Sequence, residues 1–176
     1  GGAGSGDTIR PMTATVNHPA PAFTAPAVMP DGSTGEVSLE DYKGQTVVLF
    51  FYPKDFTFVC PSELIAFDHR LGEFEKRGAQ VLGVSIDDAE SHGKWRDTAI
   101  EEGGIGPVGY PLLCDEDRSM TNAYGLLHED TTFALRGTFL IDGEGVVQSA
   151  TVNNLPLGRD VDETLRMLDS MAHAAS

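Results

Sequence analysis

Residues 46–61 read TVVLFFYPKDFTFVCP, and this stretch decides the fold. Its first part, Thr46 to Tyr52, is a β-branched and aromatic run that is apolar on both faces, which predicts a buried, central parallel strand. Downstream, Glu63 to Lys76 has apolar residues at helical spacing, and Gly78 marks the end of that helix. The sequence therefore predicts a strand, a loop that carries Cys60, and a helix.

The alternation of strands and helices continues along the chain. A second strand is predicted at Ala79 to Ile86 and a second helix at Asp88 to Glu102. The remaining predicted elements are a short strand at Tyr110 to Leu113, a weak helix at Arg118 to Tyr124, a hairpin made of Leu135 to Asp142 and Gly145 to Val152, and a final helix capped by Asp160. This order predicts an α/β protein with a thioredoxin-like fold, in which helices cover both faces of a mixed central sheet.

Composition limits the class of protein. The chain has 176 residues, enough for one ordinary domain, and no apolar run approaches the length of a membrane span. Twelve Lys and Arg against 27 Asp and Glu give a net charge of −15, which argues against a nucleic-acid or anionic-membrane surface. We expect residues 1–20 to be a tag or flexible leader and residues 21–176 to be a single domain. Two cysteines without a scaffold pattern, and no apolar signal segment, predict a reducing, cytoplasmic setting.

Cys60 is the residue best suited to chemistry. It lies at or near the first turn of the predicted helix, where unpaired backbone N–H groups and the positive end of the helix dipole favour a thiolate. Pro61 supports this placement, because proline is favoured at the first helical position. The alternative is a buried and inert cysteine, which is common for free cysteines in general. The loop favours the hypothesis of a reactive thiolate nucleophile.

The loop resembles the P-x-x-x-T-x-x-C signature of peroxiredoxins, which Pro53, Thr57 and Cys60 match, and FFYPKDFTFVCPSE is similar to the branch that contains alkyl hydroperoxide reductase C. The resemblance covers roughly residues 22–171 and includes Ser91-His92 with Trp95, Gly103-Gly104-Ile105-Gly106, Leu135-Arg136-Gly137-Thr138-Phe139 and Asn154-Leu155-Pro156-Leu157-Gly158-Arg159. It implies that Cys60 is the peroxidatic cysteine and that Thr57 contacts substrate and sulfur. It further implies that Pro53 shields the site and that Arg136 is a guanidinium partner.

The same resemblance implies an activity. The protein would be a thiol-specific peroxidase that reduces hydrogen peroxide and alkyl hydroperoxides, with Cys60 becoming a sulfenic acid. A thiol reductant, either a thioredoxin-like protein or a flavoprotein disulfide reductase system, would recycle it, without a metal or organic cofactor. Gly145 to Val152 is predicted to be a sheet-edge strand that pairs with a second copy, so we expect a homodimer. Resemblance extends this expectation to a decamer.

The sequence leaves three alternatives for the thiol that reduces oxidised Cys60. Two-cysteine relatives carry a resolving cysteine in a Val-Cys-Pro segment beyond the last helix, whereas this sequence stops at Ser176. Either that tail was removed or left out, or an external thiol is used, or Cys114 has taken over the role. We expect no stable Cys60–Cys114 disulfide, because bridging needs Cα atoms within about 7 Å and the two cysteines follow different strands.

Two other classes of function were weighed. A thioredoxin-type oxidoreductase is disfavoured because the sequence has no C-x-x-C. A holdase or redox-signalling partner would show aggregation suppression that survives Cys60→Ser. The histidines lack metal-ligand spacing, so His92 and Trp95 are interpreted as core residues. The Gly103 to Gly106 segment is interpreted as a helix-ending turn, since its spacing does not fit a dinucleotide loop.

Overall fold

The computed structural model describes residues 14–57 and 60–175, and the side chains of Cys60 and Ala175 lie outside that description. Within these residues, a seven-stranded mixed sheet has the order β2-β1-β5-β4-β3-β6-β7. The strands are β1 (Thr24–Val28), β2 (Thr34–Ser38), β3 (Thr46–Phe51), β4 (Ala79–Ser85), β5 (Leu112–Cys114), β6 (Arg136–Ile141) and β7 (Val147–Asn153). The helices are α2 (Cys60–His69), α3 (Leu71–Lys76), α4 (Ala89–Asp97), α5 (Ser119–Ala123) and α6 (Val161–Ala175), with 3-10 turns η1 (Leu39–Tyr42) and η2 (Ile100–Glu102).

Strand β3 lies inside the sheet, as its apolar run predicts. It pairs in parallel with β4, where Val48 is opposite Val81, and antiparallel with β6, where Leu49 is opposite Phe139. Residues 47–51 are all buried, because neighbouring strands and layers on both faces remove them from water. A strand of this kind needs apolar side chains on both of its faces, and TVVLFF supplies them.

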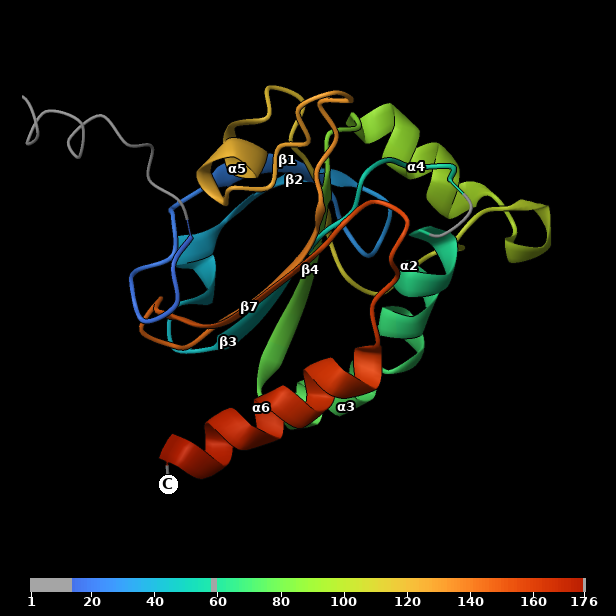
Figure 1. The fold of residues 1–176 in the computed structure, drawn as a ribbon. Helices are drawn as coiled ribbons and strands as arrows, with labels where there is room; N and C mark the ends of the chain where they lie inside the picture. Colours follow the sequence, from blue (N-terminus) through green and yellow to red (C-terminus); the bar gives the residue numbers. More distant parts are fainter. Residues whose placement is uncertain (1–13, 58–59, 176) are drawn as a thin grey trace, which may run out of the picture.

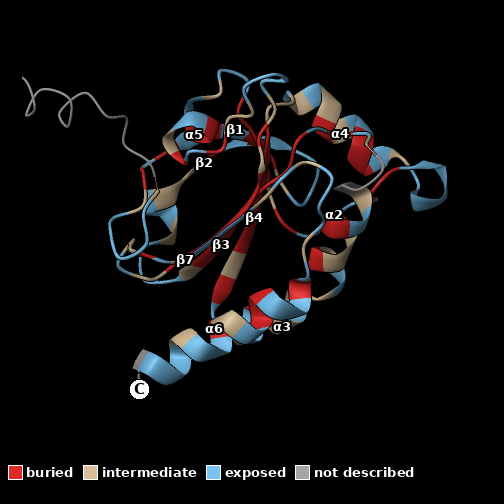
Figure 2. Ribbon diagram, viewed as in Figure 1, coloured by how far each residue is buried: buried red, intermediate tan, exposed pale blue. Residues whose placement is uncertain are grey.

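Helices cover both faces of the sheet, which confirms the predicted fold class. In Figure 1, α2, α3, α4 and α6 lie on one side of the sheet and α5 lies on the other. Successive strand residues point to opposite faces. Thus Phe50 stacks on Phe67 of α2, with ring centroids 4.3 Å apart, while Phe51 contacts Tyr124 beside α5. Figure 2 shows the buried residues gathered along the strands and the inward sides of the helices.

Some element boundaries differ from the prediction. The helix expected at Glu63 to Lys76 begins earlier, at Cys60, and is divided into α2 and α3 at Arg70. The helix expected at Asp88 to Glu102 ends at Asp97. The chain then turns so tightly that a Cβ on Gly104 would lie 2.0 Å from the Thr98 carbonyl oxygen. The β1–β2 hairpin was not predicted, because Pro26 inside the first strand argues against a strand on local grounds.

The described part of the N-terminal segment packs against the domain. Of the leader expected at residues 1–20, residues 1–13 lie outside the described residues. Asn17 N–H donates to Val147 O at 2.8 Å, and Ala20 N–H donates to Gly145 O at 2.8 Å. The hydrogen-bonded domain therefore includes residues that precede the expected boundary at residue 21. Over the described ranges 14–57 and 60–175, no helix is both long and apolar enough to cross a membrane.

Candidate active site

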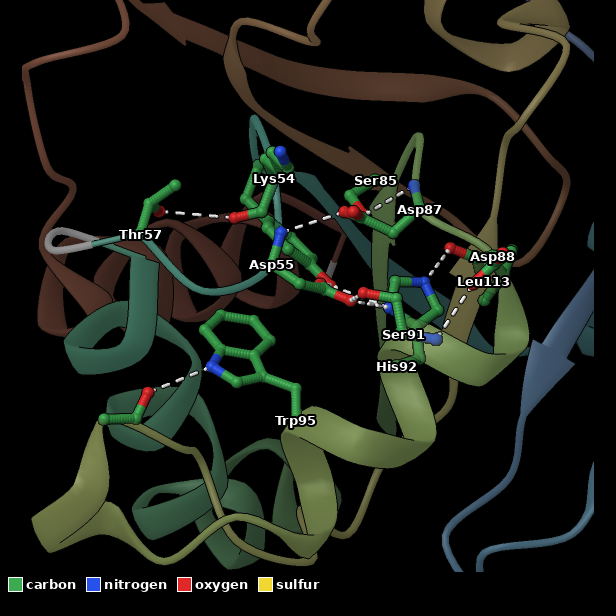
Figure 3. Close-up of polar contacts among 12 residues, drawn as sticks. Lys54, Asp55, Thr57, Ser85, Asp87, Asp88, Ser91, His92, Trp95 and Leu113 are labelled. Atoms are coloured by element: carbon green, nitrogen blue, oxygen red, sulfur yellow. Dashed lines mark hydrogen bonds and ion pairs between the residues drawn. The ribbon is translucent and has the colours of Figure 1, made fainter.

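The segment between β3 and α2 holds three of the four residues predicted for the site. β3 ends at Phe51 and α2 begins at Cys60, so Cys60 lies in the first helical turn as predicted, although its side chain lies outside the described residues. Pro53 is buried and Thr57 is half-buried. The Thr57 hydroxyl donates to the Lys54 carbonyl oxygen at 3.2 Å, which closes a tight turn within the loop (Figure 3). Pro53 and Thr57 are thus held near the start of α2.

Arg136 comes from a different strand and reaches the same end of the sheet. The antiparallel register of β3 with β6 places Phe50 opposite Thr138, so the first residue of β6 lies beside the end of β3. Arg136 is 4% exposed. Its Nη1 donates to Glu63 Oε1 at 2.5 Å and its Nε donates to the Leu155 carbonyl oxygen at 2.6 Å. Its guanidinium is therefore held in place against the first turn of α2.

Glu63 and Arg159 complete a buried cluster that the sequence interpretation missed. Arg159 donates to Glu63 Oε2 from its Nε at 2.7 Å and from its backbone N–H at 2.9 Å. Its Nη2 also donates to the carbonyl oxygen of Phe51, the last residue of β3, at 2.5 Å. Two features of the sequence could have identified these residues. Glu63 follows Cys60 by three residues, a spacing that places both on one face of a helix, and Arg159 is the last residue of the NLPLGR segment.

The electrostatics of this cluster favour an anion at the start of α2. Two guanidinium groups face one carboxylate, which leaves one net positive charge among side chains that are 3–6% exposed. The positive end of the α2 dipole adds to that field. Such charges act strongly on one another because little water screens them. An open depression of about 480 Å³ adjoins the cluster, between residues 62–70, which are α2 from Ser62 onward and Arg70 after it, and residues 158–162.

The other residues weighed from the sequence lie away from this cluster. Cys114 is buried at the end of β5, and β4 separates β5 from β3. His92 and Trp95 are both 0% exposed, which confirms their assignment to the core. Gly103 has φ +90 and follows η2, so the predicted helix-ending turn is also confirmed.

Comparisons with known proteins agree with this arrangement. The model of the AhpC/TSA family matches residues 16–150. Peroxiredoxin-2 of Bos taurus is 52% identical over 160 residues, covering 91% of this chain and 80% of that protein. The reduced 2-Cys peroxiredoxin of Plasmodium vivax superposes with a TM-score of 0.88 at 46% identity, covering 90% of this chain and 82% of that one. AhpC of Enterococcus faecalis superposes with a TM-score of 0.86 at 31% identity, covering 93% and 95%.

A thioredoxin-like sheet with a cysteine at the start of a helix, beside buried guanidinium groups, is the architecture of a thiol-based oxidoreductase. The chain belongs to the AhpC/TSA family, with typical two-cysteine peroxiredoxins among its relatives. It is a thiol-dependent peroxidase with an antioxidant function: it reduces peroxides at the expense of a thiol reductant.

Proposed function

We propose that Cys60 is the nucleophile of this peroxidase and that its thiolate attacks one oxygen of hydrogen peroxide or an alkyl hydroperoxide. A sulfur–oxygen bond forms as the oxygen–oxygen bond breaks. The other oxygen leaves with the bonding electrons and takes a proton, giving water or an alcohol. Cys60 is thereby oxidised to a sulfenic acid.

The observation that carries this proposal is the net positive cluster beside the start of α2. Glu63 binds both Arg136 and Arg159, and it lies one helical turn after position 60. Because the helix dipole and the cluster have the same sign there, both favour a thiolate over a thiol at Cys60. Arg136 is always charged and presents a planar set of donors, so it suits a thiolate and a departing oxygen.

Thr57 and Pro53 have supporting roles in the same proposal. Charge moves along the S–O–O line during attack, so donors aimed along that line stabilise the transition state more than the ground state. The Thr57 hydroxyl is half-buried on the loop and suits such a donor. Pro53 is buried beside it and limits access of water to the site.

Recycling and assembly complete the proposal. The sulfenic acid condenses with a reductant thiol, releasing water and forming a disulfide that further thiol reduces. The reductant would be a thioredoxin-like protein or a flavoprotein disulfide reductase system, and reduced thiols of this kind are abundant in the cytoplasm. The position of β7 at the edge of the sheet supports a homodimer. Further assembly of dimers into a decamer is what the resemblance to this family implies.

Peroxide consumption by three proteins tests the nucleophile. Wild type, Cys60→Ser and Cys114→Ser are each supplied with hydrogen peroxide and, in turn, with dithiothreitol, thioredoxin and a flavoprotein disulfide reductase. We expect Cys60→Ser to lose turnover with every reductant. The Cys114→Ser variant is the matched control, since it also replaces one cysteine by serine, and it should keep turnover. Peroxidase activity that persists in Cys60→Ser would refute the assignment.

A further inference from the structure

A buried polar network anchors the catalytic loop through Asp55, which is 1% exposed (Figure 3). Its Oδ1 accepts from the Tyr52 hydroxyl at 2.8 Å. Its Oδ2 accepts from the Ser91 hydroxyl and from His92 Nδ1, each at 2.8 Å. Its backbone N–H donates to Asp87 Oδ2, also at 2.8 Å. The loop is thus tied at one residue to Tyr52, which directly follows β3, to α4 and to the segment after β4.

The hydrogen-bond partners of His92 fit an imidazolium ring. Nε2 lies 2.9 Å from the carbonyl oxygen of Leu113, which only accepts, so Nε2 carries a proton. Nδ1 faces the Asp55 carboxylate, so it carries a proton as well. Burial by itself lowers the pKa of His92, but the hydrogen bond and charge of Asp55, aided by Cys114, outweigh it and raise the pKa to about 10. Three titratable side chains face His92: Asp55, Cys114 and Tyr52, whose hydroxyl lies 3.4 Å from Nδ1. A fourth, Asp87, lies beside Asp55.

The residue after Asp55 has an unusual backbone. Phe56 has φ +61, in the left-handed region that is unfavourable for a bulky residue. Such strain persists only where neighbouring contacts hold it. Asp55, which the network anchors, directly precedes Phe56. The Phe56 ring packs on the Trp95 ring, with centroids 5.8 Å apart. Directly after it comes Thr57, whose hydroxyl closes the turn onto Lys54.

We propose that His92 is a positioning residue of the peroxidase: by clamping Asp55 it holds the strained turn at Phe56 and so sets the place of the Thr57 hydroxyl relative to the start of α2. This inference rests on the proposed roles of Cys60 and Thr57. Losing the clamp lets the turn relax, and a small displacement of a donor in a reactive site costs a large factor in rate. The same thiolate also reacts with alkylating reagents, which need no hydrogen-bond donor from Thr57, and the rate of that reaction is not affected by losing the clamp.

Two reactions of Cys60 measured side by side separate positioning from folding. The first is single-turnover oxidation by hydrogen peroxide, with the sulfenic acid trapped by dimedone and quantified by mass spectrometry. The second is alkylation by iodoacetamide at the same pH. Both consume the same thiolate, so the ratio of their rate constants does not depend on how much thiolate is present. A loss of stability that still leaves the protein folded under the assay conditions leaves this ratio unchanged.

We expect His92→Gln to lower the ratio by about tenfold or more, because both donors of a glutamine amide are on one nitrogen, which cannot take the places of both ring nitrogens of His92. Ser91→Ala removes one contact from a residue that is only half-buried, and it should lower the ratio severalfold while keeping the fold. Tyr124→Phe is the matched control: it removes a buried hydroxyl bonded to Pro21 O at 2.7 Å on the opposite face of the sheet. Its ratio should equal that of wild type.

The outcomes distinguish this proposal from the one it rests on. Peroxidase activity that survives Cys60→Ser overturns both. A wild-type ratio in Ser91→Ala, and in His92→Gln where that variant folds, overturns the positioning role alone. In wild type, ¹⁵N NMR of the His92 ring at neutral pH should show two protonated nitrogens, and a neutral ring would also overturn the proposal.

Discussion

Arg136 of β6 and Glu63 of α2 are joined by a hydrogen bond of 2.5 Å, and each of the two side chains is 3% exposed. The same carboxylate binds Arg159, which precedes α6. Three segments that are far apart in the sequence therefore meet at one buried carboxylate. Because a buried charge without a partner is costly, Glu63 is important for the stability of the fold as well as for the charge of the site.

Replacing Glu63 by glutamine should destabilise the protein strongly. The change keeps the size of the side chain but removes the buried negative charge that pairs with Arg136 and Arg159, and breaking a buried ion pair costs about 3–5 kcal/mol in unfolding free energy. Urea unfolding followed by circular dichroism measures the difference. Glu73→Gln is the control, because Glu73 forms exposed ion pairs with Arg77 and Lys76, and its variant should unfold close to wild type.

The pKa of the Cys60 thiol should lie well below its usual value of about 8.5. The rate of alkylation by iodoacetamide against pH, in a Cys114→Ser background, reports this pKa. Arg136→Gln should raise it, because the variant removes the positive charge of the cluster beside α2. Arg166→Gln removes an exposed arginine that pairs with Glu163, and it should leave the Cys60 pKa where it was. An unshifted Cys60 pKa in wild type would contradict the electrostatic argument.

The Asp55–His92 pair should make stability depend on pH. The folded-state pKa of His92 is raised from 6.5 to about 10, so the folded protein holds a proton that the unfolded chain loses. The stabilisation is fully present below about pH 6.5 and is lost as pH rises through about pH 10. Unfolding free energy should fall by at most about 1.4 kcal/mol per pH unit in this window. In His92→Gln this decline in unfolding free energy should disappear. An equal decline in wild type and His92→Gln would refute the assignment of the pH dependence to His92.

Cys60 and Cys114 should not form a stable disulfide. Neighbouring strands lie about 4.8 Å apart, and β4 separates β5 from β3, so Cys114 is about 10 Å from the strand that leads to Cys60. A disulfide needs Cα atoms within about 7 Å. Peptide mapping under non-reducing conditions, after one equivalent of peroxide, should find no abundant linkage, and turnover should require an added thiol. Abundant linkage would make Cys114 the resolving cysteine.

The exposed edge of β7 should mediate dimer formation. β7 is the last strand of the sheet. Its first residue, Val147, is hydrogen-bonded to residues 17 and 18, and within the described residues the rest of the strand pairs with β6 alone. Val152 is 50% exposed on it, and a lysine at a strand edge opposes pairing with another strand. Val152→Lys should therefore shift the reduced protein toward monomer at micromolar concentration, as measured by light scattering. Ile100→Lys, at a residue 52% exposed on η2, should not. A wild type that is only monomeric would contradict the prediction.

Local pattern was sufficient for most of the sheet and its helices. The apolar run of β3, the helical spacing after Cys60 and the turn at Gly103 each follow from residues close in the chain. The break at Arg70 and the end of α4 at Asp97 were not predicted, because helical periodicity continues across both positions. The hairpin of β1 was missed because Pro26 argues against a strand, and only the tertiary structure shows that β5 pairs with β1 at residues 27 and 28 and not at Pro26.

The sequence by itself determined the class of fold and the position of Cys60 at a helix start, and by resemblance it predicted Pro53, Thr57 and Arg136 as site residues. These follow from side-chain periodicity and from a short motif, which act over a few neighbouring residues. Only the tertiary structure decided that Glu63 links Arg136 to Arg159, and that His92 binds Asp55 from 37 residues away. Contacts of this kind depend on strand order and burial, because charges pair in the interior according to which elements the sheet brings together.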